Sequence, residues 1–150
     1  MSEIPLHRIG VSAVTIDEQG RALLIQRRDN GRWEAPGGFL ELNETIEAGA
    51  RREVLEETGV VVELEQLTGI YKNMALGVIN FVFRARPLSG APQTGPETAD
   101  TRWTAREEID RLIPREAVAI RTLDALDNPP HPRIRHHDGT NLLPSKPEEL

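Results

Sequence analysis

Apolar residues near the amino terminus fall in two short runs, and polar residues separate them. Residues 11–16 and 22–26 are rich in aliphatic and β-branched side chains, and residues 17–20 between them are typical of a turn. This pattern predicts a hairpin of two antiparallel strands. The turn-forming residues 29–31 and 36–38 then predict a loop, because neither group continues regular structure easily.

In the next segment, apolar residues recur at every fourth position. Ile46, Ala50 and Val54 are spaced four apart, as on a helix with one buried stripe. Thr45 is a suitable N-cap, and Gly59 is suited to the left-handed conformation that ends many helices. We therefore expect one helix between Thr45 and Gly59.

Further extended segments and two short helices are predicted beyond this helix. Residues 60–70 and 78–85 have the composition of strands, and residues 87–96 have that of a loop. A capping-box spacing predicts a helix over residues 104–112, and a second helix is expected from Pro114.

The order of these elements predicts an α/β domain in which a central mixed sheet lies between helices. We expect this domain to occupy residues 1–127. Residues 128–150 hold five prolines and few apolar residues, which is typical of a tail that either wraps the domain or stays mobile.

Composition narrows the classes of function. A chain of 150 residues suits one domain, and no apolar stretch is long enough to cross a membrane. The net charge of -6 disfavours binding to a polynucleotide backbone, which depends on clustered Lys and Arg. The lack of cysteine excludes disulfides and thiolate metal sites. No secretory signal is evident in the first residues, so we expect a cytoplasmic protein.

Candidate chemistry lies on the helix predicted between residues 45 and 59. Glu53, Glu56 and Glu57 are spaced i, i+3 and i+4, so they share one helical face. Like charges at this spacing cost roughly a few tenths of a kcal/mol per pair, whereas a divalent cation would stabilise the cluster. Acidic runs are also common on solvated helix faces, so the cluster alone does not establish a metal site.

A longer pattern that contains these glutamates resembles the Nudix box. The matching positions are Gly38, Glu44, Arg52, Glu53, Val54, Glu56, Glu57, Gly59 and Val60. They satisfy every defining position of that motif, while the likeness outside it is loose. The resemblance implies the Nudix fold, an α/β/α sandwich with a central mixed β-sheet. It also implies a MutT-like hydrolase that cleaves phosphoric anhydrides.

The resemblance further implies a metal centre. Glu53, Glu56 and Glu57 would hold Mg²⁺ or Mn²⁺, with the carbonyl of Gly38 as a further ligand. Such hard cations prefer oxygen donors of this kind and keep coordination sites for water and phosphate.

The implied reaction is in-line attack of water on phosphorus. Arg52 would orient the glutamates, with Glu44 as its partner. Glu53, Glu56 and Arg52 are therefore the expected catalytic residues. The general base would be Glu53 or Glu56 within the box, or Glu97 from a later loop. An ordinary exposed loop glutamate is the alternative interpretation of Glu97.

Three residues outside the box are candidates for binding substrate. Arg27 and Arg28 end the second predicted strand, and guanidinium groups suit phosphate oxygens. Trp33 lies in the loop before the box and could stack on a base. Solvated arginines and a packed tryptophan are the alternatives. The run His136–Asp138 in the tail is expected at a surface or an interface rather than at a metal.

The expected function is Mg²⁺-dependent cleavage of a pyrophosphate bond in a nucleoside diphosphate linked to another moiety, such as a nucleoside triphosphate or ADP-ribose. The expected partner is this small nucleotide-like molecule, with no polynucleotide and no membrane. The alternative is a Nudix-fold domain that binds nucleotides as a sensor without cleaving them. The sequence leaves open the identity of the substrate and whether the chain forms a homodimer.

Overall fold

In the computed structural model, which describes residues 3–144, two β-sheets form the centre of the molecule. The larger sheet has the strand order β4-β1-β6-β5-β8-β9, and the smaller sheet has the order β3-β2-β7. The strands are β1 (Arg8–Thr15), β2 (Ala22–Arg27), β3 (Trp33–Glu34), β4 (Gly37–Phe39), β5 (Val61–Asn73), β6 (Val78–Ser89), β7 (Thr98–Thr104), β8 (Arg133–His137) and β9 (Leu142–Leu143).

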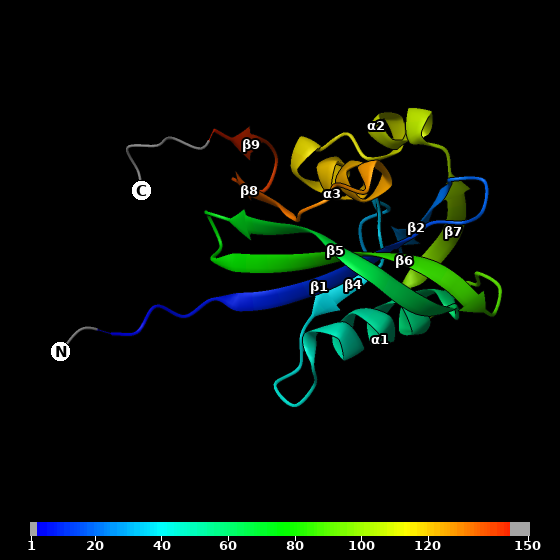
Figure 1. Ribbon diagram of the computed structural model, residues 1–150, viewed down its shortest axis with the longest axis horizontal. Helices are drawn as coiled ribbons and strands as arrows, with labels where there is room; N and C mark the ends of the chain where they lie inside the picture. Colours follow the sequence, from blue (N-terminus) through cyan, green and yellow to red (C-terminus); the bar gives the residue numbers. More distant parts are fainter. Residues whose placement is uncertain (1–2, 145–150) are drawn as a thin grey trace.

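Helices cover both faces of the larger sheet. Helix α1 (Ile46–Thr58) lies on one face, and α2 (Ile109–Leu112) and α3 (Glu116–Asp127) lie on the other, after the 3-10 turn η1 (Arg106–Glu108) (Figure 1). The sheet is mixed, because β1 pairs in parallel with β6 and β5 pairs in parallel with β8, while its other pairs are antiparallel. This arrangement confirms the predicted α/β sandwich. Among residues 3–144, no helix is both long and apolar enough to pass through a membrane.

Helix α1 packs through the residues predicted to form its buried stripe. Ala50 and Val54 are completely buried in the main apolar cluster. At the start of the helix, Thr45 Oγ1 accepts a hydrogen bond of 3.1 Å from the backbone N–H of Ala48. Gly59 ends it with a φ of 75°, where a side chain would be strained. The predicted helix and both of its ends are confirmed.

The predicted amino-terminal hairpin is wrong, although both of its strands are present. Strand β1 pairs with β4 and β6, and β2 pairs with β3 and β7, so the two strands lie in different sheets. Ile16 and Ala22 form an isolated bridge where the chain passes from one sheet to the other. Both strands are buried over most of their length, which suits strands covered on two faces rather than a half-exposed hairpin.

Two further predictions need correction after β6. The segment predicted as a loop over residues 87–96 begins later, because β6 continues to Ser89. Residues 98–104 form the unpredicted strand β7. The buried positions of β7 are Thr98 and Thr104. The sequence therefore lacks the alternation of apolar and polar residues that predicts a strand. The predicted capping box does not form, since Ala105 is the N-cap of η1 and Thr104 bonds to the carbonyl of Arg102.

Part of the predicted tail belongs to the larger sheet. Strand β8 runs parallel to β5, with Gly69 opposite Arg133 and Asn73 opposite His137. Over this stretch the tail therefore wraps the domain, which is one of the two arrangements expected. Residues 145–150 of the tail lie outside the described residues, and the boundary at residue 127 stays a prediction.

Candidate active site

Arg52 lies at the centre of a group of carboxylates that joins α1 to the loop before it. Its guanidinium donates two hydrogen bonds to Glu44, of 2.6 and 2.9 Å. Nη1 donates to Glu53 Oε1 at 2.8 Å and more weakly to Glu56 Oε2 at 3.3 Å. The guanidinium lowers the pKa of Glu44 to about 2, so the pair is ionised. Glu44 thus anchors Arg52, and Arg52 fixes one carboxylate oxygen of Glu53.

Glu53 and Glu57, one turn apart on α1, bring their carboxylates together. Each residue is 9% exposed, and the backbone N–H of Gly37 donates to Glu57 Oε1 at 3.2 Å. Burial raises the pKa of Glu57 to about 9, with a further contribution from its hydrogen bond to Glu53 and the charge of that neighbour. The Glu57 carboxyl group is therefore protonated at neutral pH unless a cation is bound.

The glycine pair of β4 allows the strand to lie directly against these carboxylates. A Cβ at Gly38 would lie 2.6 Å from Glu53 Oε1, and a Cβ at Gly37 would lie 2.7 Å from the carbonyl oxygen of Val11. Both distances are shorter than non-bonded contacts allow, so a side chain at Gly37 would push β4 away from β1, and one at Gly38 would displace the Glu53 carboxylate. The backbone of Gly38 therefore lines the same space as the Glu53 carboxylate.

A cavity of about 570 Å³ opens beside the carboxylate pair. It is lined by Glu53 and Glu57 together with four other residues singled out from the sequence, Gly38, Arg27, Arg28 and Glu97. The backbone N–H of Arg28 donates to the carbonyl of Glu97 at 3.0 Å, and its Nε donates to the carbonyl of Gly95 at 2.8 Å. Arg28 therefore braces the loop that carries Glu97 against the end of β2.

The donor set beside α1 fits a hard divalent cation. Carboxylate oxygens of Glu53 and Glu57 and the backbone of Gly38 line one cavity, and Mg²⁺ binds through a few such oxygens while retaining waters. Within residues 3–144, no three His, Asp or Glu side chains already converge as a metal cage. The side chain of Glu56 is 58% exposed, bonds to Arg52 and does not line this cavity. Its place in the three-glutamate ligand set stays a prediction.

Trp33 and His137 lie outside the cavity beside the carboxylate pair. Trp33 lines neither this cavity nor the one described next, and it packs against the apolar cluster of Leu24 and Ile109. Trp33 also lines a third cavity, of about 380 Å³, so its expected role in substrate binding stays a prediction. His137 is 2% exposed, which corrects its expected place at a surface.

A second cavity of about 510 Å³ shares Arg27 and the residues of β4 with the first. Its other lining residues include Glu34, Arg115, Arg121 and His137, none of which was expected at a ligand site. The arginines come from the start and middle of α3, and the histidine comes from β8. No spacing in the sequence relates these elements, because β8 is placed by its pairing with β5, and α3 is placed by packing on β5 and β6.

Comparison with known proteins agrees with this geometry. A family model described as NUDIX domain matches residues 6–126. The chain belongs to the Nudix family. As a Nudix hydrolase, it is related to a MutT-like protein of Streptomyces ambofaciens, with 48% identity over 94% of this chain and 90% of that protein. Nudix hydrolases act on small nucleotide-like substrates.

Two further similarities are more distant. A putative 8-oxo-dGTP diphosphatase of Bacillus subtilis is 32% identical over 64% of this chain and 65% of its own length. The crystal structure of a NUDIX hydrolase from Nitrosomonas europaea superposes with a TM-score of 0.77 and 26% identity, over 90% of this chain and 82% of that chain. The fold expected from the box is therefore confirmed.

Proposed function

We propose that this Nudix hydrolase cleaves the diphosphate bond of a nucleoside diphosphate linked to another moiety, with Mg²⁺ or Mn²⁺ as its cofactor. The observation that carries the proposal is the Glu53–Glu57 carboxylate pair in one of two adjoining cavities, which share Arg27 and β4. Each cavity lies in the size range of small-molecule sites. A diphosphate placed beside the carboxylates leaves room for the two halves of such a substrate.

We assign a separate role to each residue around the diphosphate. When bound, the divalent cation supplies charge neutralisation on the phosphate oxygens and a more acidic water. Arg52 keeps the Glu53 carboxylate oriented, and the N–H of Gly37 does the same for Glu57. Glu97 lines the same cavity as this pair, which suits a general base that removes the proton of the attacking water. Glu53 and Glu56 are the alternatives for that role.

Arg27 is suited to hold the diphosphate because it lines both cavities. Its guanidinium is already oriented by Asp29, through hydrogen bonds of 2.9 and 2.7 Å, and by Glu34 at 3.5 Å. A positioned guanidinium binds phosphate oxygens at a lower entropic cost than a free one. Both a nucleoside triphosphate and an ADP-ribose-like molecule would meet these requirements. The name of the Bacillus subtilis relative supports the former class, and that of an ADP-ribose pyrophosphatase of Methanocaldococcus jannaschii supports the latter.

The proposal is tested by product release from a panel of nucleoside triphosphates, dinucleotides and nucleotide sugars. Each substrate is measured with Mg²⁺, with Mn²⁺ and with EDTA. We expect metal-dependent turnover of at least one class, and its loss in Glu57→Gln. The matched control is Glu47→Gln, which changes an exposed glutamate on the same helix. Tight nucleotide binding without release across the panel would instead identify a sensor.

A further inference from the structure

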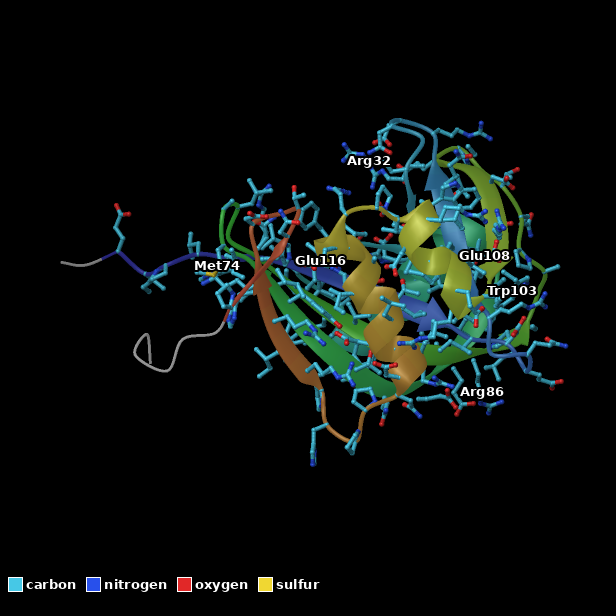
Figure 2. All side chains as sticks on the ribbon, turned by 90° about the horizontal axis from the view of Figure 1, so that it is seen from above. Arg32, Met74, Arg86, Trp103, Glu108 and Glu116 are labelled. Carbon is cyan, nitrogen blue, oxygen red and sulfur yellow. The ribbon has the colours of Figure 1, made fainter. Side chains whose placement is uncertain are left out.

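The inner end of the second cavity gathers cationic and donor groups from two elements. Arg115 and Arg121 come from the start and middle of α3, and His137 comes from the end of β8. Figure 2 shows Met74 and Glu116, which mark the turn after β5 and the start of α3, on the side of the molecule where β8 and β9 lie. The backbone N–H of Met74 donates to the carbonyl of His137 at 2.8 Å, so this end is closed by the turn after β5.

The hydrogen bonds of His137 fix which ring nitrogen carries its proton. The backbone N–H of Gly139 donates to Nδ1 at 3.0 Å, so Nδ1 is unprotonated. Burial and the nearby Arg121 lower the pKa of His137 to about 4, so the ring is neutral. A neutral ring with a free Nδ1 carries its hydrogen on Nε2. That Nε2–H faces Nη2 of Arg121 at 3.4 Å, and both groups are donors.

Arg121 has further donors without an acceptor. Its Nε is buried and bonds to no atom of the described residues. Its guanidinium lies over the ring of Tyr71, 5.7 Å from the centroid, which contributes little compared with a carboxylate partner. Within residues 3–144, neither Arg121 nor Arg115 has a carboxylate oxygen within 4.0 Å. Burial lowers the pKa of both arginines, and the attraction of Glu34 offsets this only in part.

The two carboxylates that line this cavity are already engaged. Glu34 pairs with Arg27 at 3.5 Å. Asp138 Oδ1 accepts the backbone N–H groups of Thr140 and Asn141 at 2.9 and 2.8 Å. Three arginines therefore face two occupied carboxylates, in a chain whose net charge is -6. The lining of the cavity is therefore positively charged, whereas the chain as a whole is negatively charged.

We propose that this inner end of the cavity binds an oxyanion, a phosphate or a carboxylate, carried by the part of the substrate remote from the scissile diphosphate. The inference rests on the proposed function, since it adds a second anionic group to that substrate. One oxyanion accepts from His137 Nε2 and from Arg121 Nη2, and it compensates the charges of both arginines. A neutral carbonyl would satisfy one donor and leave the charges buried.

The rest of the cavity suits the body of such a moiety. Phe39 and Leu76 line it, and they are 57% and 64% exposed. Exposed apolar side chains beside a polar inner end favour a planar or sugar-like body with an anionic terminus. Because the cavity shares Gly37–Phe39 with the carboxylate cavity, one extended molecule reaches both.

The test compares substrates that differ by a single oxyanion. ADP-ribose is paired with ADP-ribose 2′-phosphate, and UDP-glucose is paired with UDP-glucuronate, so one pair tests a phosphate and the other a carboxylate. We expect the anionic member of at least one pair to have a kcat/KM higher by about tenfold to a hundredfold, as for a charge-assisted hydrogen bond. The gain should lie mainly in KM, because the group is remote from the reacting phosphorus.

Two variants test whether Arg115 and Arg121 cause the preference for the anionic substrate. Arg115→Gln and Arg121→Gln should each reduce it by about tenfold or more while changing the neutral member of the pair less. Arg111→Gln is the matched control, because Arg111 is 70% exposed and lines neither cavity. Equal kcat/KM for both members in the wild-type protein would overturn the inference, even if the variants fail to fold.

Calorimetric binding separates this inference from the proposed function. It is measured with the same pairs in the presence of Ca²⁺. If no substrate is hydrolysed but the anionic member binds more tightly, the proposed hydrolysis fails and the oxyanion site stands. Hydrolysis without any preference in either measurement supports the proposed function and overturns the oxyanion site.

Discussion

The hydroxyl of Tyr71 donates a hydrogen bond of 2.7 Å to Asp124 Oδ2, and both side chains are completely buried. Arg133 and Arg135 from β8 donate to the same carboxylate at 2.6 to 2.9 Å. Burial alone would raise the pKa of Asp124, but the hydrogen bonds from Arg135, Tyr71 and Arg133 hold it below its ordinary value. One carboxylate thus joins β5, α3 and the strand that carries His137.

Replacing this carboxylate should loosen β8 from the domain. Asp124→Asn removes the partner of two arginines, and we expect a loss of about 2 to 3 kcal/mol in the free energy of unfolding. This is less than for a fully buried pair, because both guanidinium groups reach solvent. Denaturant unfolding measures it, and Asp127→Asn, at the exposed partner of Arg133, should cost about 1 kcal/mol or less. Equal losses in the two variants would contradict a central role for Asp124.

The paired carboxylates predict how the metal-free protein responds to pH. The folded-state pKa of Glu57 is about 9, above its ordinary value of 4.5. A raised pKa stabilises the fold fully below the ordinary value, and this stability is lost as the pH rises through the folded-state value. In EDTA, the thermal midpoint of the wild-type protein should therefore fall more between about pH 6 and about pH 9 than that of Glu57→Gln. Identical pH dependence in the two proteins would exclude the raised pKa of Glu57.

Much of the catalytic half of the fold could be predicted because its determinants are local. Helix α1 has its cap, buried stripe and glycine stop within residues 45–59, and the glutamates follow from helical geometry. The Arg52–Glu44 pair also spans a short stretch of chain. Such features depend on neighbours in sequence, so periodicity and motif spacing are sufficient to find them.

The second cavity and the smaller sheet could not be predicted, because they depend on contacts between distant segments. Strand β7 pairs with β2 across more than seventy residues of sequence and presents buried threonines instead of an apolar alternation. His137 reaches the cavity through the parallel pairing of β8 with β5. Nothing in the local pattern around either segment indicates its partner, since register is set by tertiary packing.

Replacing Gly38 should lower the catalytic efficiency. In Gly38→Ala the new Cβ would meet the Glu53 carboxylate at 2.6 Å, so this carboxylate must leave its position beside Arg52. We expect kcat/KM to fall by about tenfold or more and stability by about 1 to 3 kcal/mol. The control is Gly95→Ala, where a Cβ would meet nothing within 4 Å. Wild-type activity in Gly38→Ala would show that the close approach of β4 has no role in the reaction.

Replacing Glu97 distinguishes it from Glu53 and Glu56 as the general base. Its exposed side chain lines the carboxylate cavity, and the contact with Arg28 uses its backbone carbonyl, so Glu97→Gln keeps that contact. If Glu97 removes the proton of the attacking water, kcat should fall by about 10² to 10⁴ with stability unchanged within about 0.5 kcal/mol. Glu63→Gln, at an exposed glutamate of β5, should leave kcat unchanged. A wild-type kcat in Glu97→Gln would instead assign the base to Glu53 or Glu56, because these are the remaining candidates on α1.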